Sequence, residues 1–416
     1  MEGPLMRRVV ITGMGAASSL GLDLKTIEQN LRNGTSGISY HPDYEAHGFN
    51  SLVSGRIKEW HPADLLPRKA LKTMGRGAQF TSFAGLEAVQ DSGLSESDVH
   101  SDRCGVIVGC GEASPLDMFE SGVAMHEHNK PRRMGIRVPR TMGSSHSANL
   151  TMLLKNLGMS LAIIDACATG LANIGYAYQV VKWGLQDVVL AGGGDAADWA
   201  GGAFFDAMGV LSCRYNDTPE KASRPFDKDR DGFIMSEGGG IVIVEELERA
   251  RARGARIYGE ILGYATNCDG GYSMVAPNPD GSTRCMQMVL KEAEVKPQEI
   301  DYINTHGTST VTGDPSEITA IKRVFQEHTP MVTSTKSQIG HTIGAAGALE
   351  LIASLLMLNG GFIAPSLNLD QVDDECVYEN FVTQPTQVAF NTFLTNNFAF
   401  GGSNASMVVR SIGHRA

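Results

Sequence analysis

Hydrophobic and polar positions repeat along the chain with two different periods, and the switches between them predict the secondary structure. The segment FTSFAGLEAVQDSGLSESDV, residues 80–99, has the apolar spacing of an amphipathic helix that ends at a Gly-Leu turn. The β-branched run RCGVIVGCGEAS, residues 103–114, predicts a strand that runs into glycines. The same order recurs where CMQMVLKEAEVKPQEI, residues 285–300, predicts a helix and DYINTHGTST, residues 301–310, a strand and loop. Strands that alternate with helices of this length indicate βαβ units and buried parallel sheets.

A larger unit also repeats along the chain. The opening strand RRVVITGMGA, residues 7–16, is matched by RIYGEILGYA at residues 256–265. The sharp bend, small-residue helix and returning strand that follow the opening strand have a counterpart in STKSQIGHTIGAAGALELIASLLMLNGGFIAP, residues 334–365. Two copies indicate an α/β protein of two similar halves packed together. We place the division near residues 251–255, which gives halves of residues 1–252 and 253–416.

The composition and charge are those of a soluble globular protein. With 416 residues, 42% of them hydrophobic, the chain can bury one large core or two moderate ones. The start MEGPLMRRVVITG lacks an apolar signal core, and long apolar segments such as AGALELIASLLMLNGGFIAP are too short or carry an internal charge. We therefore expect no membrane insertion and a cytoplasmic location. A net charge of -11 argues against nucleic acid as the main ligand.

Metal and cofactor chemistry finds little support in the sequence. The seven cysteines contain no CxxC pair, which argues against a zinc site and against a disulfide framework. The turn DKDRDG, residues 227–232, has the acids that begin a calcium loop, but its twelfth position is Gly238 instead of glutamate. The run GGGD, residues 192–195, has no GxGxxG or GK[ST] nearby and predicts a tight turn at a strand end. We expect no metal and no cofactor.

One cysteine lies between a predicted strand and a predicted helix. The run SLAIID, residues 160–165, predicts the strand, Cys167 lies at the bend, and ATGLANIGYAYQVVKWG, residues 168–184, predicts a buried helix. At a helix N-terminus the unpaired amides and the positive end of the helix dipole stabilise a thiolate and lower the thiol pKa, which predicts a nucleophile. The alternative is a small buried cysteine, but three further loops favour the nucleophile.

Two of these loops carry histidine. His306 follows an apolar strand in INTHGTST, and Lys336 and His341 lie five residues apart in STKSQIGHTIGAAG, ahead of a small-residue helix. A glycine-rich third loop, NNFAFGGSNAS, follows the strand VAFNTFL and can supply backbone amides. Because the carboxyl ends of strands form the ligand crevice of α/β sheets, we expect these loops to converge on Cys167.

Four motifs resemble the signatures of one enzyme family. They are ACATG around Cys167, NTHGTST around His306, TKSQIGHTIGAAG around Lys336 and His341, and NFAFGGSN around Phe400. In this order, and over nearly the whole chain, the sequence resembles the β-ketoacyl-[acyl-carrier-protein] synthases, which are condensing enzymes with the thiolase fold. Residues 205–233 and 360–369 are most similar to synthase I of bacterial fatty-acid synthesis, with synthase II next.

The resemblance implies a fold, an activity and partners. The fold is α/β and thiolase-like, with mixed sheets and helices packed in layers, and strands of two N-terminal halves pair across the two-fold axis of a homodimer. The activity is that of an acyltransferase, which condenses an acyl-enzyme with malonyl-acyl-carrier-protein in type II fatty-acid elongation. The partners are acyl-acyl-carrier-protein and malonyl-acyl-carrier-protein. A specialised type II ketosynthase for a polyene or another secondary product is the alternative.

The resemblance also implies roles for single residues. Cys167 would attack the acyl thioester and hold the acyl chain. N–H donors of His306 and His341 would stabilise the enolate formed when the malonyl group loses CO2. Lys336 would hold His341 and supply positive charge, with Glu317 as its anchor. The remaining implied contacts are an oxyanion hole made by the amides of Cys167 and Phe400, and contacts of Thr308 and Thr310 with the pantetheine arm.

Two basic clusters stand out on an acidic chain. The first is PRKALK, residues 67–72, and the second is NKPRRMGIR, residues 129–137. A solvated face is the simpler interpretation of both. Since carrier proteins are acidic, and the resembling synthases dock them with basic residues near these positions, we expect the clusters to bind the carrier protein. The docking residues we expect are Arg68, Lys69, Lys72, Arg132 and Arg133.

Four positions depart from the family pattern. Asp165 stands two residues before Cys167, where Ser or Thr is usual, and an ionised carboxylate there would oppose thiolate formation. Glu112 lies where small or apolar residues border the acyl pocket. Ala399 replaces the middle glycine of the FGFGG gate, and Val311 replaces a proline after HGTST. Asp165 and Glu112 bear on the acyl substrate more than on the reaction.

Overall fold

A long mixed sheet runs through the molecule. The computed structural model describes residues 6–129, 131–271 and 273–412. The strands are β1 Val9–Ala17, β2 Ser39–Tyr40, β3 Val53–Ser54, β4 Cys104–Gly109, β5 Ser160–Leu161, β6 Val188–Asp195, β7 Gly238–Glu246, β8 Gly259–Cys268, β9 Tyr302–Asn304, β10 Met331–Thr333, β11 Phe362–Ile363, β12 Thr386–Gln387, β13 Thr392–Ala399 and β14 Ser403–Arg410. Ten of them form one sheet in the order β10-β9-β13-β14-β8-β1-β7-β6-β4-β5, and β2–β3 and β11–β12 form separate pairs.

Parallel and antiparallel pairs are both present in this sheet. β4 pairs in parallel with β5 and β6, and β9 pairs in parallel with β10 and β13. The central strands β14, β8, β1, β7 and β6 pair antiparallel. The expectation of buried parallel sheets is therefore wrong for the centre, whereas the expected mixed sheet is confirmed. β1 and β8 pair only over residues 9–11 and 259–261, so the two halves share a short seam.

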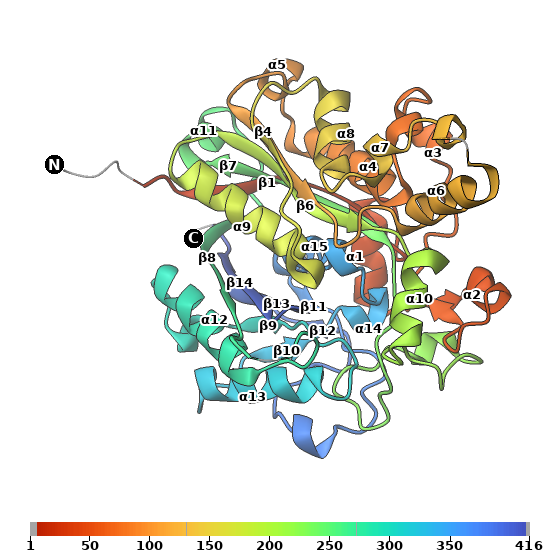
Figure 1. The fold of residues 1–416 in the computed structure, drawn as a ribbon. Coiled ribbons are helices and arrows are strands. Elements are labelled where there is room, and N and C mark those ends of the chain that lie inside the picture. The colour runs from red at the N-terminus through yellow and green to blue at the C-terminus, as the bar shows by residue number, and fades with distance from the viewer. Residues whose placement is uncertain (1–5, 130, 272, 413–416) are drawn as a thin grey trace.

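Helices separate and cover the two halves of the sheet. They are α1 Leu24–Asn33, α2 Pro42–Ala46, α3 Pro62–Leu65, α4 Arg76–Ser92, α5 Glu96–Val99, α6 Pro115–His128, α7 Val138–Thr141, α8 Ser145–Leu154, α9 Thr169–Lys182, α10 Trp199–Ala207, α11 Leu247–Ala252, α12 Pro279–Glu292, α13 Gly313–Phe325, α14 Lys336–Ile339 and α15 Ala346–Gly360. The 3-10 helices are η1 Ala70–Thr73, η2 Pro131–Met134, η3 Ala166–Ala168, η4 Pro219–Lys221, η5 Pro297–Glu299, η6 Ile343–Ala345 and η7 Asp374–Cys376. In Figure 1, α9 and α15 lie between the upper strands of the first half and the lower strands of the second. α4 and α8 pack on the outer face of the upper strands, and α12, with α13 beside it, covers β8 and β14.

The central helix α15 is apolar on all sides because strands or helices cover each of its faces. Its residues 346–358 are all buried, as in a helix inside a core. The stretch Ile343–Gly360 is long and apolar enough to cross a membrane, yet 89% of it is buried inside the protein. Its one charged side chain, Glu350, is buried as well.

Most predicted elements are confirmed, with shifted ends. α4 and β4 match the first predicted helix and strand, α12 and β9 match the second, and α9 matches the helix after Cys167. The predicted strand at residues 160–165 is wrong in length, because only the two residues of β5 pair with β4. β13 extends through Ala399, so the start of the expected glycine-rich loop belongs to a strand.

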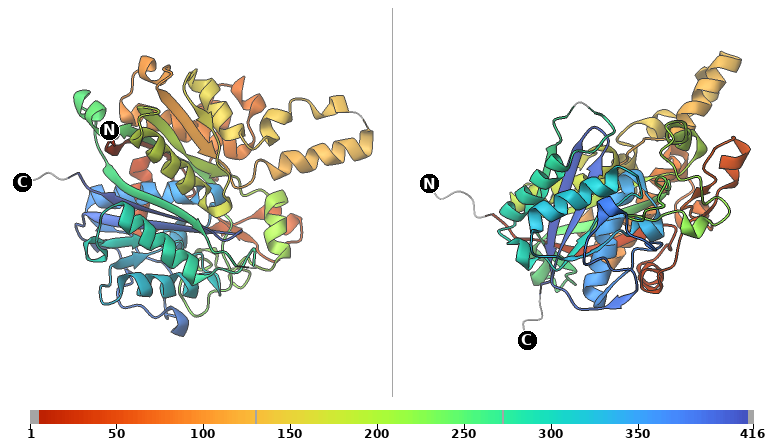
Figure 2. Two further views of the ribbon diagram at one scale, coloured as in Figure 1. Left: turned by 60° about the vertical axis from the view of Figure 1, so that its left-hand side comes forward. Right: turned by 90° about the horizontal axis from the view of Figure 1, so that it is seen from below.

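Two features at the rim of the first half carry exposed apolar residues. β5 is the last strand of the sheet, both of its residues are exposed, and among the described residues its outer edge has no partner strand. Figure 2 shows α6, in orange-yellow, projecting away from the body of the protein. Met118 and Phe119 on this helix are about half exposed.

Candidate active site

The predicted strand-end loops meet in one pocket. Cys167, His306 and His341 all line a cavity of about 420 Å³, together with Phe400 at the tip of the β13–β14 hairpin. His306 lies two residues after β9, His341 lies two residues after α14, and Cys167 lies in η3 directly ahead of α9. The expected convergence of these loops on Cys167 is confirmed.

Cys167 follows a strained bend in the backbone. Ala166 has a φ of 42°, in the left-handed region that residues with a Cβ atom seldom adopt. The backbone N–H of Asp165 donates to Oγ1 of Thr169 at 2.8 Å, which closes the turn into α9. The bend brings Sγ of Cys167 to 3.0 Å from Nε2 of His341.

Burial governs the acidity of the Cys167 thiol. It raises the pKa of Cys167 to about 12, against the opposing effects of the Lys336 charge and of the backbone N–H groups of Phe400 and of Cys167 itself. The net direction is opposite to the expected lowering, because desolvation of the thiolate outweighs these N–H groups and the lysine charge. The thiol must therefore lose its proton as it attacks.

The two histidines are buried and neutral. Their ring centroids lie 5.4 Å apart and the ring planes cross at 89°. Burial, and after it the positive charge of Lys336, lowers the pKa of His306 and of His341 well below the ordinary value. A neutral imidazole keeps one N–H, so the pair can offer two donors to an oxygen in the pocket.

Lys336 makes its hydrogen bonds to groups other than those expected. Its Nζ forms a close ion pair with Glu350 and lies 3.4 Å from Nδ1 of His306. Glu317 accepts the backbone N–H of His306 at 3.0 Å and that of the next residue at 2.8 Å. We expected Glu317 to bind Lys336 and Lys336 to bind His341. Both expectations are wrong, because Lys336 binds Glu350 and His306 instead. α13 directs Glu317 at the loop backbone, and Glu350 reaches the ammonium from α15.

Glu350 and Asn397 are site residues that the sequence analysis did not identify. Nδ2 of Asn397 donates to Oε2 of Glu350 at 2.8 Å and lies 3.5 Å from Nδ1 of His306. One acid inside an otherwise apolar helix is the signal that identifies Glu350, because a buried carboxylate requires a partner. Asn397 lies within β13 and has no comparable signal.

Comparison with known proteins decides the family. The model of "Beta-ketoacyl synthase, N-terminal domain" matches residues 6–250, and that of "Beta-ketoacyl synthase, C-terminal domain" matches residues 258–370. The chain belongs to the β-ketoacyl synthase family. A curated relative, 3-oxoacyl-[acyl-carrier-protein] synthase 1 of Haemophilus influenzae, is 43% identical over 97% of this chain and 99% of its own length.

Solved β-ketoacyl synthase structures share the fold. A β-ketoacyl synthase from Burkholderia phymatum STM815 has a TM-score of 0.93 and 34% identity, and the match covers 98% of this chain and 100% of that one. A ketosynthase chain from a type II PKS complex with its acyl-carrier protein, bound to the hexaketide, has a TM-score of 0.88 and 30% identity over 98% of this chain and 100% of its own. The predicted thiolase-like α/β fold is confirmed.

The synthase pocket also contains the groups expected to form the oxyanion hole and the pantetheine channel. Phe400 is 38% exposed and lines the pocket with Cys167, and its backbone N–H lowers the pKa of the Cys167 thiol. Thr308 and Thr310 line the same pocket, with their hydroxyl oxygens 3.0 Å apart. These positions suit the expected roles, which stay predictions.

Glu112 lies beside the synthase pocket rather than in its wall. Phe205 and Ile343 line the pocket, and Glu112 is not among the described residues that do so. The Glu112 carboxyl group packs on α10, where a Cβ atom at Gly201 would come within 2.5 Å of Oε2. Burial, with an added effect of the Asp198 charge, raises the pKa of Glu112 to about 7. The carboxyl group thus lies between the wall of the pocket and α10.

The other departures from the family pattern have simple surroundings. Val311 is 60% exposed, so the absence of proline there leaves a surface side chain. Ala399 is partly buried, and its carbonyl oxygen accepts the N–H of Gly402 at 3.1 Å in the β13–β14 turn. Asp165 is partly buried at the start of η3.

The structure describes the side chains of three of the five expected docking residues. Arg68, Lys69 and Lys72 are exposed around η1. The side chains of Arg132 and Arg133, and Lys130 as a whole, lie outside the described residues.

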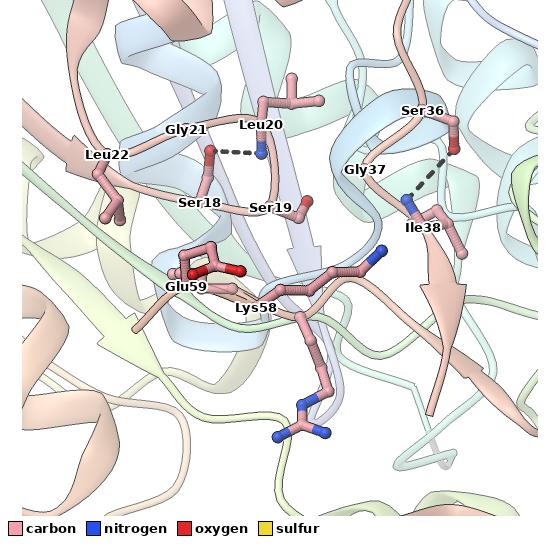
Figure 3. A pocket seen from close by; sticks show the side chains of 12 residues that line it. Ser18, Ser19, Leu20, Gly21, Leu22, Ser36, Gly37, Ile38, Lys58 and Glu59 are labelled. Atoms are coloured by element: carbon pink, nitrogen blue, oxygen red, sulfur yellow. Dashed lines mark hydrogen bonds between the residues drawn. The ribbon is translucent and has the colours of Figure 1, made fainter. Parts of the chain in front are cut away.

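A second cavity, of about 280 Å³, is separate from the synthase pocket (Figure 3). It is lined by residues 18–22, 36–38 and 56–59, and it shares no lining residue with the catalytic pocket. The hydroxyls of Ser18 and Ser36 accept the N–H groups of Leu20 and Ile38 at 3.2 and 3.3 Å. The hydroxyl of Ser19 donates to the carbonyl oxygen of Ile339 at 3.3 Å, so the three hydroxyl groups of this cavity bind backbone groups.

Proposed function

We propose that Cys167 is the nucleophile that carries the acyl chain. Its sulfur forms a bond to the carbonyl carbon of an acyl-carrier thioester, the bond to the pantetheine sulfur breaks, and the departing thiol takes up the proton that Cys167 loses. The N–H groups of Cys167 and Phe400 act at the same place and hold the carbonyl oxygen during the attack. The observation that supports this assignment is a thiol, two neutral imidazoles and these amides in one pocket.

His306 and His341 serve the second half of the reaction. When the malonyl group loses CO2, the electron pair of the broken C–C bond moves into the thioester, and one N–H from each imidazole stabilises the enolate oxygen. The enolate carbon then attacks the acyl carbonyl, the bond to the sulfur of Cys167 breaks, and the released thiolate takes up a proton from water to restore the thiol. The protein catalyses this decarboxylative condensation in fatty-acid elongation and yields 3-oxoacyl-acyl-carrier-protein.

The groups around the histidines keep them neutral and oriented. Lys336 lowers both histidine pKa values, and Glu350 balances the charge of the lysine. Glu317 fixes the backbone of the His306 loop. The roles proposed for Thr308 and Thr310 are contacts with the pantetheine arm.

Acyl carrier protein is the partner, and the chain is similar to a ketosynthase that binds one. We assign docking to the exposed basic residues around η1, with Arg132 and Arg133 as the proposed second contact. We also propose that the protein is cytoplasmic and has no nucleic-acid partner. The proposed division of the chain is into residues 1–252 and 253–416.

An elongation assay tests the proposed function. The purified protein, supplied with acyl-carrier and malonyl-carrier substrates, should release CO2 and form 3-oxoacyl-acyl-carrier-protein in equal amounts by mass spectrometry. Malonyl decarboxylation without elongated product at every acyl chain length would contradict it. Elongation of conjugated polyenoyl-carrier substrates in preference to saturated ones would favour the specialised ketosynthase.

We further propose a homodimer built on β5. Leu161, Ile164 and Leu157 on and beside this edge strand are 40%, 54% and 61% exposed, and an open edge strand with apolar neighbours favours pairing with a second strand. A two-fold interface would bring β5 of each copy together. Light scattering should show a dimer at micromolar concentration. Leu161→Lys should shift it toward monomer, because a charge on an edge strand opposes pairing.

Met288→Lys is the control for the dimer. Met288 is 45% exposed and lies on α12, which covers β8 and β14 in the second half of the sheet. It should leave the dimer intact. A stable and active wild-type monomer would refute the proposed interface.

Glu112 is proposed to limit the depth of the acyl site. Phe205 of α10 and Ile343 line the pocket, Glu112 packs on α10 at Gly201, and Ile343 contacts the position of Gly111 next to Glu112. Glu112→Gly opens space behind this wall, so it should shift the preference in kcat/KM toward longer acyl-carrier substrates. A series of chain lengths measures the shift.

Glu112→Gln separates volume from charge in the same experiment. It keeps the side-chain volume and should leave the chain-length profile close to that of the wild type. If the Glu112→Gly and wild-type profiles superimpose, Glu112 supports only α10 and is not part of the acyl site.

A further inference from the structure

The GGGD run ends β6 in a buried carboxyl group that the reaction above does not use. Asp195 is 3% exposed. Its Oδ2 accepts the backbone N–H groups of Gly111 and Gly344, both at 2.7 Å, and its Oδ1 accepts that of Glu112 at 3.2 Å. Gly111 and Glu112 belong to the loop after β4, whereas Gly344 belongs to the loop after His341. One side chain therefore joins two loops that are more than two hundred residues apart.

The two loops approach so closely that glycine is required at their contact. A Cβ atom on Gly344 would lie 2.3 Å from the backbone nitrogen of Gly111, and one on Gly193 would lie 2.2 Å from the carbonyl oxygen of Gly344. Both distances are shorter than any normal contact. The two loops and the end of β6 are thus in direct backbone contact around Asp195. If one loop moves, the other must move with it.

The residue before Gly344 is strained. Ile343 has a φ of 47°, which is rare for a β-branched residue, and its side chain lines the catalytic pocket. Such a conformation persists only where the surroundings hold it. The hydrogen bond from Gly344 to Asp195 supplies that restraint at the adjoining peptide.

The restrained loop carries His341. The first anchor of this loop is the backbone of His341 itself. The N–H of His341 donates to the carbonyl oxygen of Ile234 at 2.7 Å, and the carbonyl oxygen of His341 accepts the N–H of Ser236 at 2.9 Å. Gly344, three residues later, is the second anchor. The imidazole between these anchors lies 3.0 Å from Sγ of Cys167, so its place depends on both.

We propose that Asp195 is a positioning residue of the condensing site, which clamps the loop after β4 to the loop after His341 and thereby sets His341 and Ile343 against Cys167. The inference rests on the proposed function, since the malonyl step is the one assigned to His341. Burial, and after it the charge of Glu112, raises the pKa of Asp195 well above its ordinary value. Oδ2 accepts two of the three N–H groups, so the amide oxygen of asparagine can take its place.

Two substitutions test this clamp. Asp195→Ala removes both acceptors, and kcat for condensation should fall about 10- to 100-fold with KM changed less than about twofold, because misplacement of a catalytic group costs rate more than binding. Asp195→Asn keeps an oxygen for Gly111 and Gly344, and should restore kcat to within about fivefold of wild type. Alkylation of Cys167 by iodoacetamide, which needs no histidine donor to an enolate, should continue in both variants.

Asp198→Asn is the matched control. Asp198 is a half-buried carboxyl group three residues after β6, and it caps α10 by accepting the N–H of Gly201 at 2.9 Å. Asparagine is an equally good cap. Its kcat should equal that of the wild type. Thermal unfolding of each variant shows whether the fold is intact.

Three results would overturn the clamp. They are an unchanged kcat in Asp195→Ala, an Asp195→Asn variant as impaired as Asp195→Ala, and a loss of alkylation in parallel with kcat. If Asp195→Ala does not fold, Asp195→Ser decides, because its shorter side chain fills part of the space but no longer reaches both loops. A lower kcat in a folded Asp195→Ser protein supports the clamp and a wild-type kcat refutes it. A wild-type protein without condensing activity would refute the proposed function instead.

Discussion

Replacing Cys167 with alanine should lower the condensation rate by a factor of about 10⁴ or more, because no acyl-enzyme can form without the sulfur. Decarboxylation of malonyl-acyl-carrier-protein should persist, since the donors of His306 and His341 remain in place. Intact-protein mass spectrometry after incubation with acyl-acyl-carrier-protein measures the first half-reaction, and CO2 release measures the second.

Cys213→Ala is the control for this experiment. Cys213 is an exposed free thiol outside the pocket, so its removal should leave both the acyl adduct and the product unchanged. An acyl adduct on the Cys167→Ala protein would place the acyl chain on another residue. Loss of CO2 release in that variant would mean that decarboxylation requires the acyl-enzyme.

The fold was predictable where the sequence pattern is set by burial. α4 with β4, and α12 with β9, have the apolar spacing of helices and strands that face a core, and both pairs were recognised. The segment 160–165 forms a shorter strand than expected because Leu161 and Ile164 are exposed at an edge of the sheet instead of buried in it. Apolar composition alone does not distinguish an exposed edge strand from a buried one. Antiparallel pairing at the centre was also invisible, because alternation of helices and strands does not specify the direction of pairing.

The site residues could be predicted where the residue type itself indicates a chemical role. A thiol at a bend and two histidines at strand ends stand out in a sequence, and the structure brings Cys167, His306 and His341 into one pocket. Partners on helices were less visible. Glu350 was passed over as an internal charge in an apolar helix, although that charge is what holds Lys336.

Electrostatic properties and backbone clamps lay beyond the sequence. The pKa of Cys167 depends on how completely the pocket excludes water, and burial reverses the direction expected from the helix N-terminus. Asp195 acts on three backbone N–H groups, which have no signature in the residue types that supply them. The predicted tight turn at GGGD is wrong, because all four residues belong to β6 and pair with β7.

His306→Ala and His341→Ala should each allow acylation of Cys167 but block the malonyl step. Each substitution removes one N–H donor from the enolate oxygen, and the loss of one such donor costs about 10²- to 10³-fold in rate. CO2 release from malonyl-acyl-carrier-protein should fall by that factor, while mass spectrometry should still detect the acyl adduct. His61→Ala, at an exposed histidine, is the control and should change neither measurement.

The two histidine variants also separate the roles of the imidazoles. His341 lies 3.0 Å from Sγ of Cys167, whereas His306 contacts Lys336, so slower acylation confined to His341→Ala would show that His341 also assists loss of the thiol proton. Because both histidine pKa values are lowered, the rings stay neutral as the pH rises from about 6 to 8, and wild-type decarboxylation should not follow a histidine titration in that range. A rate that changes tenfold between these pH values, or failure of both variants to form the acyl-enzyme, would mean that the histidines act in an earlier step as acids or bases rather than as neutral donors to the enolate.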